Sequence, residues 1–161
     1  LRLRKEQNDM KIAVRRLREE DVEPLSVIES SSFSMPWSAR DFADLLEKPY
    51  CFYLVAEADD RVVGCCGFTD LCGEGSIDNV VVAEEYRGRG IAQRMLRELL
   101  VLGEKQGICD FTLEVRVSNS AAIHVYEKLG FASEGVRPGY YERPAEDALI
   151  MWRRRQKKPW Q

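Results

Sequence analysis

The chain has 161 residues, of which 45% are hydrophobic and 32% are charged, and its net charge at pH 7 is −3. This length and composition fit one folded domain and exclude a wholly disordered chain, and no apolar run approaches the ~20 residues of a membrane-spanning helix. The acidic balance argues against direct nucleic-acid binding. We therefore interpret the basic cluster at 153–158 as a solvated tail rather than an RNA-directed patch.

The two ends of the sequence differ in character from its middle. Residues 1–9 are basic and polar, lack the apolar segment of a secretory signal, and are predicted to be an N-terminal extension or leader. Residues 156–161 are predicted to form a basic and polar tail. The stretch between them, 10–155, contains no repeat or linker and is predicted to be a single domain.

The five cysteines bear on metal binding and on the compartment. They form no CxxC pair, and the only histidine is His124, so no zinc site and no other metal is predicted. Cys51, Cys65 and Cys109 lie in apolar, strand-like runs and are predicted to pack in the core as free thiols. Free thiols in odd number favour the reducing cytoplasm.

Hydrophobic periodicity and turn residues predict a series of strands and helices. In chain order they are a strand at 11–18, a helix at 20–32, a helix that starts at a capping box at 38–41 and ends by Pro49, strands at 51–58, 61–70 and 76–83, a helix at 90–106, a strand at 109–117, a helix at 119–129, and strands at 131–137 and 148–153 around a loop that contains 139–141. Hairpins come first and strand–helix–strand crossovers later. This order predicts a mixed α/β (α+β) fold, with a central sheet of about six or seven strands flanked by about four helices.

A glycine-rich loop joins the strand at 76–83 to the long helix at 90–106. Gly88 and Gly90 let the backbone approach a ligand closely, and the first amides of the helix have no partners within the helix. Together with the helix dipole they favour a pyrophosphate, to which Arg87 and Arg89 add positive charge.

Three phosphate-binding motifs compete for this loop. The P-loop pattern is absent. The dinucleotide pattern GxGxxG nearly fits, but Gln93 replaces its third small residue, and the loop starts too far beyond the strand. The pattern [RQ]xxGx[GA] fits without a gap over residues 87–92. That pattern resembles the acetyl-CoA signature of the GCN5-related N-acetyltransferase (GNAT) family.

A second informative segment covers 113–131. Glu114 is a carboxylate inside an apolar strand, which is costly unless the group is paired, protonated or exposed, and which suits either a general base or a solvent-facing residue beside Arg116. Asn119 is a good N-cap for the helix that follows. Tyr126 lies two turns into that helix, where it could pack in the core or present its hydroxyl to a cleft.

The amino-acid sequence of 113–131 resembles the second acetyl-CoA block of the GNAT family. Most of the chain, about 12–153, is similar to the RimI type, the bacterial ribosomal-protein alanine N-acetyltransferases. The resemblance implies that Glu114 is the general base and Tyr126 the general acid. It also implies that the backbone of Val80, Val81 and Val82 holds the pantetheine arm and the acetyl carbonyl. The implied pyrophosphate loop is Arg87, Gly88, Arg89, Gly90, Ile91, Ala92 and Gln93, and Asn119 is an implied acetyl-CoA contact.

The function implied by the resemblance is direct acetyl transfer from acetyl-CoA to a protein N-terminus, the expected acceptor being the N-terminal alanine of a small-subunit ribosomal protein. Trp37, Tyr140 and Tyr141 are candidates to grip the peptide, although each could equally serve in packing. An acetyltransferase for a small-molecule amine or lysine, a non-catalytic acyl-CoA-binding module and a nicotinamide-binding domain stay open as alternatives.

Overall fold

The computed structural model describes residues 10–155. Over these residues the chain forms seven strands, four α-helices and two short 3-10 helices, in agreement with the predicted fold class. The strands are β1 (Ile12–Arg16), β2 (Cys51–Ala58), β3 (Arg61–Leu71), β4 (Glu74–Val82), β5 (Asp110–Arg116), β6 (Ala132–Glu142) and β7 (Ala145–Arg153). The helices are η1 (Glu19–Asp21), α1 (Val22–Ser32), α2 (Ala39–Leu46), η2 (Glu84–Tyr86), α3 (Ile91–Lys105) and α4 (Ser120–Lys128). The predicted extension and tail lie outside the described residues.

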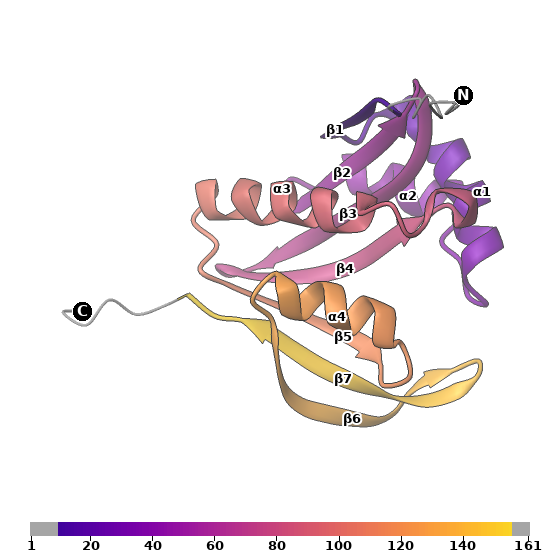
Figure 1. The fold of residues 1–161 in the computed structure, drawn as a ribbon. Helices are drawn as coiled ribbons and strands as arrows, with labels where there is room; N and C mark the ends of the chain where they lie inside the picture. Colours follow the sequence, from indigo (N-terminus) through magenta and orange to yellow (C-terminus); the bar gives the residue numbers. More distant parts are fainter. Residues whose placement is uncertain (1–9, 156–161) are drawn as a thin grey trace, which may run out of the picture.

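The strands form one sheet in the order β1-β2-β3-β4-β5-β7-β6. All neighbours are antiparallel except β4 and β5, which run parallel. Their pairing is short: residues 74–76 of β4 pair with 110–112 of β5, and beyond that point the two strands separate. Figure 1 shows this divergence, with β4 continuing toward α1 and β5 turning away from it alongside β7. The site described below lies where the strands part.

The sheet is covered by helices on both faces, and strand alternation explains how one strand serves both cores. On β2, Tyr53 and Val55 pack with residues of α1 and α2, whereas Leu54 and Ala56 pack with residues of α3 and α4. Helix α3 buries an apolar stripe, formed by Ile91, Met95, Leu96, Leu99 and Leu100. Figure 1 shows α3 and α4 on the same face, opposite α1 and α2.

The capping box predicted for α2 is present. Ser38 Oγ accepts a hydrogen bond from the Asp41 amide at 3.2 Å, and Asp41 Oδ2 accepts from the Ser38 amide at 2.7 Å. These reciprocal bonds satisfy two backbone donors that a helix start otherwise leaves open. They fix the point at which the α1–α2 loop ends, and this loop forms one wall of the site.

Two predictions about the chain were wrong in detail. The segment with Gly139, Tyr140 and Tyr141 is not a loop but part of β6, because a register shift against β7 between 137 and 141 lets the strand bulge and then continue. Cys109 is exposed instead of buried, since it precedes the first residue of β5 and lies at the end of the sheet. Cys65 is buried as predicted, and Cys51 is half-buried.

A buried ion pair ties β1 to η1 and supports a stability prediction. Asp21, 1% exposed, accepts hydrogen bonds from the Arg15 guanidinium at 2.7 and 2.8 Å and from the Arg18 amide at 2.8 Å. Burial alone would raise the pKa of Asp21, but the bonds from Arg15 and Arg18 outweigh it and lower the pKa. We expect Asp21→Asn to lower the free energy of unfolding at pH 7 by about 2 kcal/mol, because it removes the buried counter-ion of Arg15 and leaves only the partly exposed Glu57 as its partner.

The pH dependence of this effect has a defined sign. A lowered pKa means that the stabilisation is present above the unfolded pKa of about 3.9 and is lost as the pH falls through the folded value. Urea unfolding of the wild type and of Asp21→Asn at pH 7, 5 and 3 should therefore show a difference that shrinks below about pH 4. A difference of the same size at all three pH values would contradict this assignment.

Candidate active site

A cavity of about 680 Å³ opens where β4 and β5 separate, and we call it the splay cavity. Its walls come from the α1–α2 loop, β4, β5, the start of α4 and the β6–β7 hairpin. It brings together these predicted site residues: Trp37, Val80, Glu114, Asn119, Tyr126, Tyr140 and Tyr141. The predicted phosphate loop, 87–93, and the side chains of Val81 and Val82 do not line it.

The backbone amide and carbonyl groups of two β4 residues, Val80 and Val82, face the gap between β4 and β5. The Ala83 amide donates to a carbonyl of β3 at 2.7 Å, and because backbone groups alternate along an antiparallel strand, those of Val81 also face β3. Those of Val80 and Val82 therefore face the other way, where β5 pairs only with the first three residues of β4. Arg87 Nε donates to the Val82 carbonyl at 2.9 Å, in agreement with this direction. Within the described residues, the amides of Val80 and Val82 have no strand partner on that side.

Glu114 lies on β5 beside the splay. Its side chain is 21% exposed and faces the cavity, and its carboxylate lies 3.5 Å from the Arg137 guanidinium of β6. The apolar side chains on either side of it, Leu113 and Val115, point into the opposite core, as alternation requires. Glu114 can therefore occupy an apolar strand without burying its charge. A carboxylate that is open to the cavity can accept a proton.

Tyr126 lies on α4, across the cavity from β4. Its ring is buried and meets Phe131 edge-on at a centroid distance of 5.9 Å. Its hydroxyl belongs to a residue that lines the cavity, and no described residue forms a hydrogen bond with it. Burial of the ring raises the pKa of Tyr126. The packing predicted as one alternative for Tyr126 is present in the ring, and the hydroxyl has no hydrogen-bond partner among residues 10–155.

The start of α3 carries the glycine-rich loop. Gly88 and Gly90 have φ values of +73° and +76°, in the left-handed region, and a Cβ added at either position would have no heavy atom within 4 Å. Gly90 precedes the first residue of α3, whose first amides have no partners within the helix. The loop therefore presents backbone donors to open space.

The two arginines of this loop have different surroundings. Besides its bond to Val82, Arg87 donates to the Ser32 hydroxyl at 3.0 Å, so its guanidinium braces β4 against α1. Arg89 is exposed, lies over the Tyr86 ring at 5.6 Å and donates to a backbone carbonyl of η2 at 3.2 Å. Arg89, rather than Arg87, is free to turn toward an anion at the loop.

The wall opposite Tyr126 contains residues that the sequence reasoning missed. Glu29 of α1 is 1% exposed, and its carboxylate accepts hydrogen bonds from the Asn79 amide group of β4 and from the Trp37 amide at 3.3 Å. Burial raises the pKa of Glu29, although both bonds oppose the effect. The signal that could have revealed this contact is a glutamate four residues after Leu25, on the buried face of the helix.

Arg116 contacts the β6–β7 hairpin on the side of the cavity that Tyr140 and Tyr141 line. Its guanidinium lies 4.2 Å from the centroid of Tyr141 and donates to the carbonyls of Arg143 and Pro144 in the β6–β7 turn. Burial raises the pKa of Tyr141 to about 12. Tyr140 is half-exposed and packs edge-on against Tyr141. The hairpin therefore presents two phenol rings to the cavity on a fixed strand.

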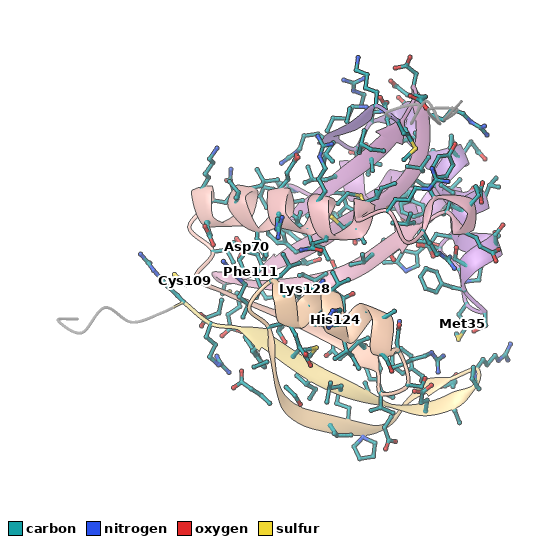
Figure 2. The ribbon with its side chains drawn as sticks, viewed as in Figure 1. Met35, Asp70, Cys109, Phe111, His124 and Lys128 are labelled. Carbon is teal, nitrogen blue, oxygen red and sulfur yellow. The ribbon has the colours of Figure 1, made fainter. Side chains whose placement is uncertain are left out.

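A larger cavity, of about 870 Å³, lies at the far end of the sheet and is separate from this site. It is lined by the last turns of α3 and α4 and by residues 153–155, and none of the predicted site residues contributes to it. Figure 2 shows Met35, which lines the splay cavity, and Cys109, which lines the larger one, at opposite sides of the molecule. Two of the four arginines that line the larger cavity, Arg153 and Arg154, pair with carboxylates, as in the Arg153–Glu104 pair at 2.8 Å.

A family model described as the acetyltransferase (GNAT) family matches residues 16–131. The chain belongs to this family. It is accordingly an N-acetyltransferase, and the GNAT family uses acetyl-CoA as acyl donor. Among residues 10–155 no helix is long and apolar enough to cross a membrane, and no group of three or more potential ligands could hold a metal ion.

Relatives of named function match most of the chain. A Bacillus subtilis protein, named as a candidate ribosomal protein bS18-alanine N-acetyltransferase, is 41% identical over 88% of this chain and 95% of its own length. The ribosomal protein bS18-alanine N-acetyltransferase of Salmonella typhimurium is 34% identical over 77% and 84%, respectively. The crystal structure of the ribosomal-protein-S18-alanine N-acetyltransferase from Escherichia coli superposes with a TM-score of 0.83 at 27% identity, over 92% of this chain and 97% of that one.

The GNAT chain has a place that fits the pyrophosphate of acetyl-CoA. A diphosphate needs several convergent N–H donors and space for close approach, and the open cradle at Gly88 and Gly90 before α3 supplies both. The unpartnered amides of Val80 and Val82 lie on β4, the strand that precedes this loop. An acetyl-CoA molecule extended from the loop toward these amides would bring its thioester to the splay cavity, between Glu114 and Tyr126.

The cradle supports a prediction with an internal control. We expect Gly90→Ala to raise the Kd for CoA about tenfold, because a methyl group would fill the approach path of the diphosphate. Gly107→Ala is the matched control, because Gly107 also has a left-handed φ and open space but lies beyond the other end of α3. Both variants should lose about 1 kcal/mol of unfolding free energy through backbone strain. Calorimetric titration with CoA should separate them, and equal weakening in both would contradict the placement.

Proposed function

We propose that this acetyltransferase modifies the α-amine of a protein N-terminus, and that the acceptor is the N-terminal alanine of a small-subunit ribosomal protein. The observation that carries the proposal is the placement of Glu114 of β5 and Tyr126 of α4 in one cavity at the β4–β5 splay, together with Tyr140 and Tyr141 of β6. The names of the relatives support the same acceptor, since the Salmonella typhimurium enzyme is named for the alanine of ribosomal protein bS18 and the Bacillus subtilis protein is named as a candidate for the same activity.

Glu114 acts as the general base in this proposal. The α-amine of a peptide has a pKa of about 7.7–8.0, so a large part of it is protonated near neutral pH and cannot attack. The Glu114 carboxylate, open to the cavity, accepts the proton from the amine directly or through one water. Its neighbour Arg137 lies 3.5 Å away on β6, at the side of the carboxylate that faces the hairpin.

Acetyl-CoA, when bound, supplies a thioester whose carbonyl carbon is attacked, so that a C–N bond forms and the C–S bond breaks. The amides of Val80 and Val82 are positioned to donate hydrogen bonds to the carbonyl oxygen as negative charge develops on it. Tyr126 donates its hydroxyl proton to the sulfur. The raised pKa of Tyr126 keeps this hydroxyl protonated throughout the working range of pH.

The shape of the cavity favours a peptide end. The α1–α2 loop and the β6–β7 turn approach each other over it, and the Ser34 hydroxyl donates to the Arg143 carbonyl across this gap. Trp37 packs against Phe42 and Tyr53, so its ring is a fixed surface rather than a mobile one. Aromatic walls of this kind suit contact with an extended peptide. The free cysteines of the chain support a cytoplasmic site of action, where ribosomal proteins are made.

The proposal is tested by mass spectrometry on a panel of acceptors. The wild type is incubated with acetyl-CoA and with an alanine-first ribosomal-protein peptide, the same peptide with a blocked N-terminus and an internal lysine, or spermidine. We expect a single acetyl group on the α-amine of the first peptide, with a kcat/KM at least tenfold above that for the other two. A kcat/KM for spermidine or for the lysine peptide equal to that for the alanine-first peptide would contradict the proposal and indicate a small-molecule or lysine acceptor. CoA binding without turnover of any acceptor would indicate a binding module.

A further inference from the structure

Asp78 of β4 lies in the splay cavity but has no role in the mechanism above. It occupies a β-bulge: Ile77 pairs with Phe68 of β3 and Asn79 with Gly67, so Asp78 is the extra residue between two adjacent pairs. A bulge redirects a side chain that regular alternation would place elsewhere. Here it lies two residues beyond the last β4–β5 pair, at the same level as Glu114 on β5.

One oxygen of this carboxylate is fixed and the other is free. Asp78 Oδ2 accepts hydrogen bonds from the Thr69 hydroxyl at 2.5 Å and from the Tyr53 hydroxyl at 3.5 Å. Tyr53 is 3% exposed and packs under the sheet, so this anchor is rigid. Among residues 10–155 both hydrogen bonds of defined geometry to Asp78 reach Oδ2, and the Ser76 hydroxyl of the same strand lies near the carboxylate. Asp78 lines the cavity and is exposed to it, so Oδ1 is held in place and remains accessible to a ligand.

The charges around Asp78 favour a cation. Desolvation by the cavity walls raises the pKa of Asp78, and the negative charge of Glu114 adds to this effect, whereas hydrogen bonds from the hydroxyls of Thr69, Tyr53 and Ser76 oppose it. Two carboxylates that face each other repel, and a positive group placed between them relieves the repulsion. Arg116, which lines the cavity, is bound to Glu146 and to carbonyls of the β6–β7 turn. Arg137 pairs with Glu114, and among residues 10–155 no cationic side chain forms a salt bridge with Asp78. A small ammonium group has the charge and the three donors needed to contact both acids.

We propose that Asp78 is a specificity-determining residue that receives the ammonium form of the acceptor's α-amine and holds its nitrogen opposite Glu114. This inference rests on the proposed function of the cavity. Asp78 contributes to binding the amine before the proton is lost, and Glu114 then takes the proton. Because this contact is made in the ground state, its loss raises KM for the acceptor and does not lower kcat.

The test uses Asp78→Asn, which keeps an oxygen for the two hydroxyls and removes the charge. We expect KM for the alanine-first peptide to rise about tenfold, as for loss of a charge-assisted hydrogen bond, with kcat and the KM for acetyl-CoA within twofold of the wild type. Glu134→Gln is the matched control, because it removes the same charge from β6, where Glu134 pairs with Arg154. That control should leave both KM values unchanged.

A second measurement separates recognition of the amine from a merely structural role. The inhibition constant of a des-amino peptide, identical except that a hydrogen replaces the α-amine, is measured with both proteins. Asp78→Asn should raise the KM for the amine peptide but leave the inhibition constant of the des-amino peptide at the wild-type value. Equal weakening of both peptides, or an unchanged KM for the amine peptide, would overturn the inference. If the wild type acetylates no peptide, the proposed function fails and the inference fails with it, and the wild-type reaction alone identifies that case.

Discussion

Glu114→Gln is expected to lower kcat/KM for an alanine-first peptide by about 10²–10⁴-fold at pH 7, while the Kd for CoA stays unchanged. The amide has nearly the shape of the carboxylate and keeps the packing of β5, but it cannot accept the proton of the α-ammonium. The rate is measured from the release of CoA under saturating acetyl-CoA. Glu104→Gln is the control, because Glu104 lies at the far end of α3 and pairs with Arg153.

The pH dependence of this variant distinguishes a lost base from a distorted cavity. Above the amine pKa of about 7.7–8.0 the acceptor is already deprotonated in solution, so a base is needed less. The deficit of Glu114→Gln should therefore shrink steadily between pH 6 and pH 9.5. Wild-type turnover across this range would refute the role of Glu114, and a deficit that stays constant would point to misplacement of the acceptor instead.

Tyr126→Phe is expected to lower kcat by about 10²-fold with little change in either KM. The variant keeps the ring that packs edge-on against Phe131 and removes only the hydroxyl, for which the described residues provide no partner. Its unfolding free energy should stay within about 0.5 kcal/mol of the wild type, since no buried hydrogen bond is lost. Single-turnover kinetics by rapid quench, together with urea unfolding, measure both quantities. Full kcat in the variant would leave Tyr126 with a packing role alone.

Local patterns sufficed to predict the parts of the fold and site that depend on neighbouring residues. The capping box at Ser38 and Asp41, the amphipathic α3 and the Asn119 cap of α4 are all set within one or two turns of helix. The glycine-rich loop before α3 belongs to the same class, because its left-handed positions need glycine wherever the rest of the chain lies.

Features that depend on distant strands could not be predicted in this way. The bulge at Asp78 arises from the register between β3 and β4, and its anchor Tyr53 comes from β2. The contact between Glu29 and Asn79 joins residues fifty positions apart. The sequence around Arg87 does not distinguish an arginine that binds a phosphate from one that holds β4 against α1. Only the fold places the Ser32 hydroxyl and the Val82 carbonyl beside Arg87. An interruption of an apolar strand by a polar pair, as at residues 78 and 79, is the signal to look for.

The most direct test of the account is a crystal structure of this protein with a conjugate in which CoA is joined through its acetyl group to an alanine-first peptide. We expect the diphosphate to lie on the amides at the start of α3, the sulfur within hydrogen-bond distance of the Tyr126 hydroxyl, and the α-nitrogen between Glu114 and Asp78. The peptide should leave the cavity beside Tyr140 and Tyr141. A conjugate whose α-nitrogen lies on the other side of β4, or more than one water away from Glu114, would contradict the proposed site.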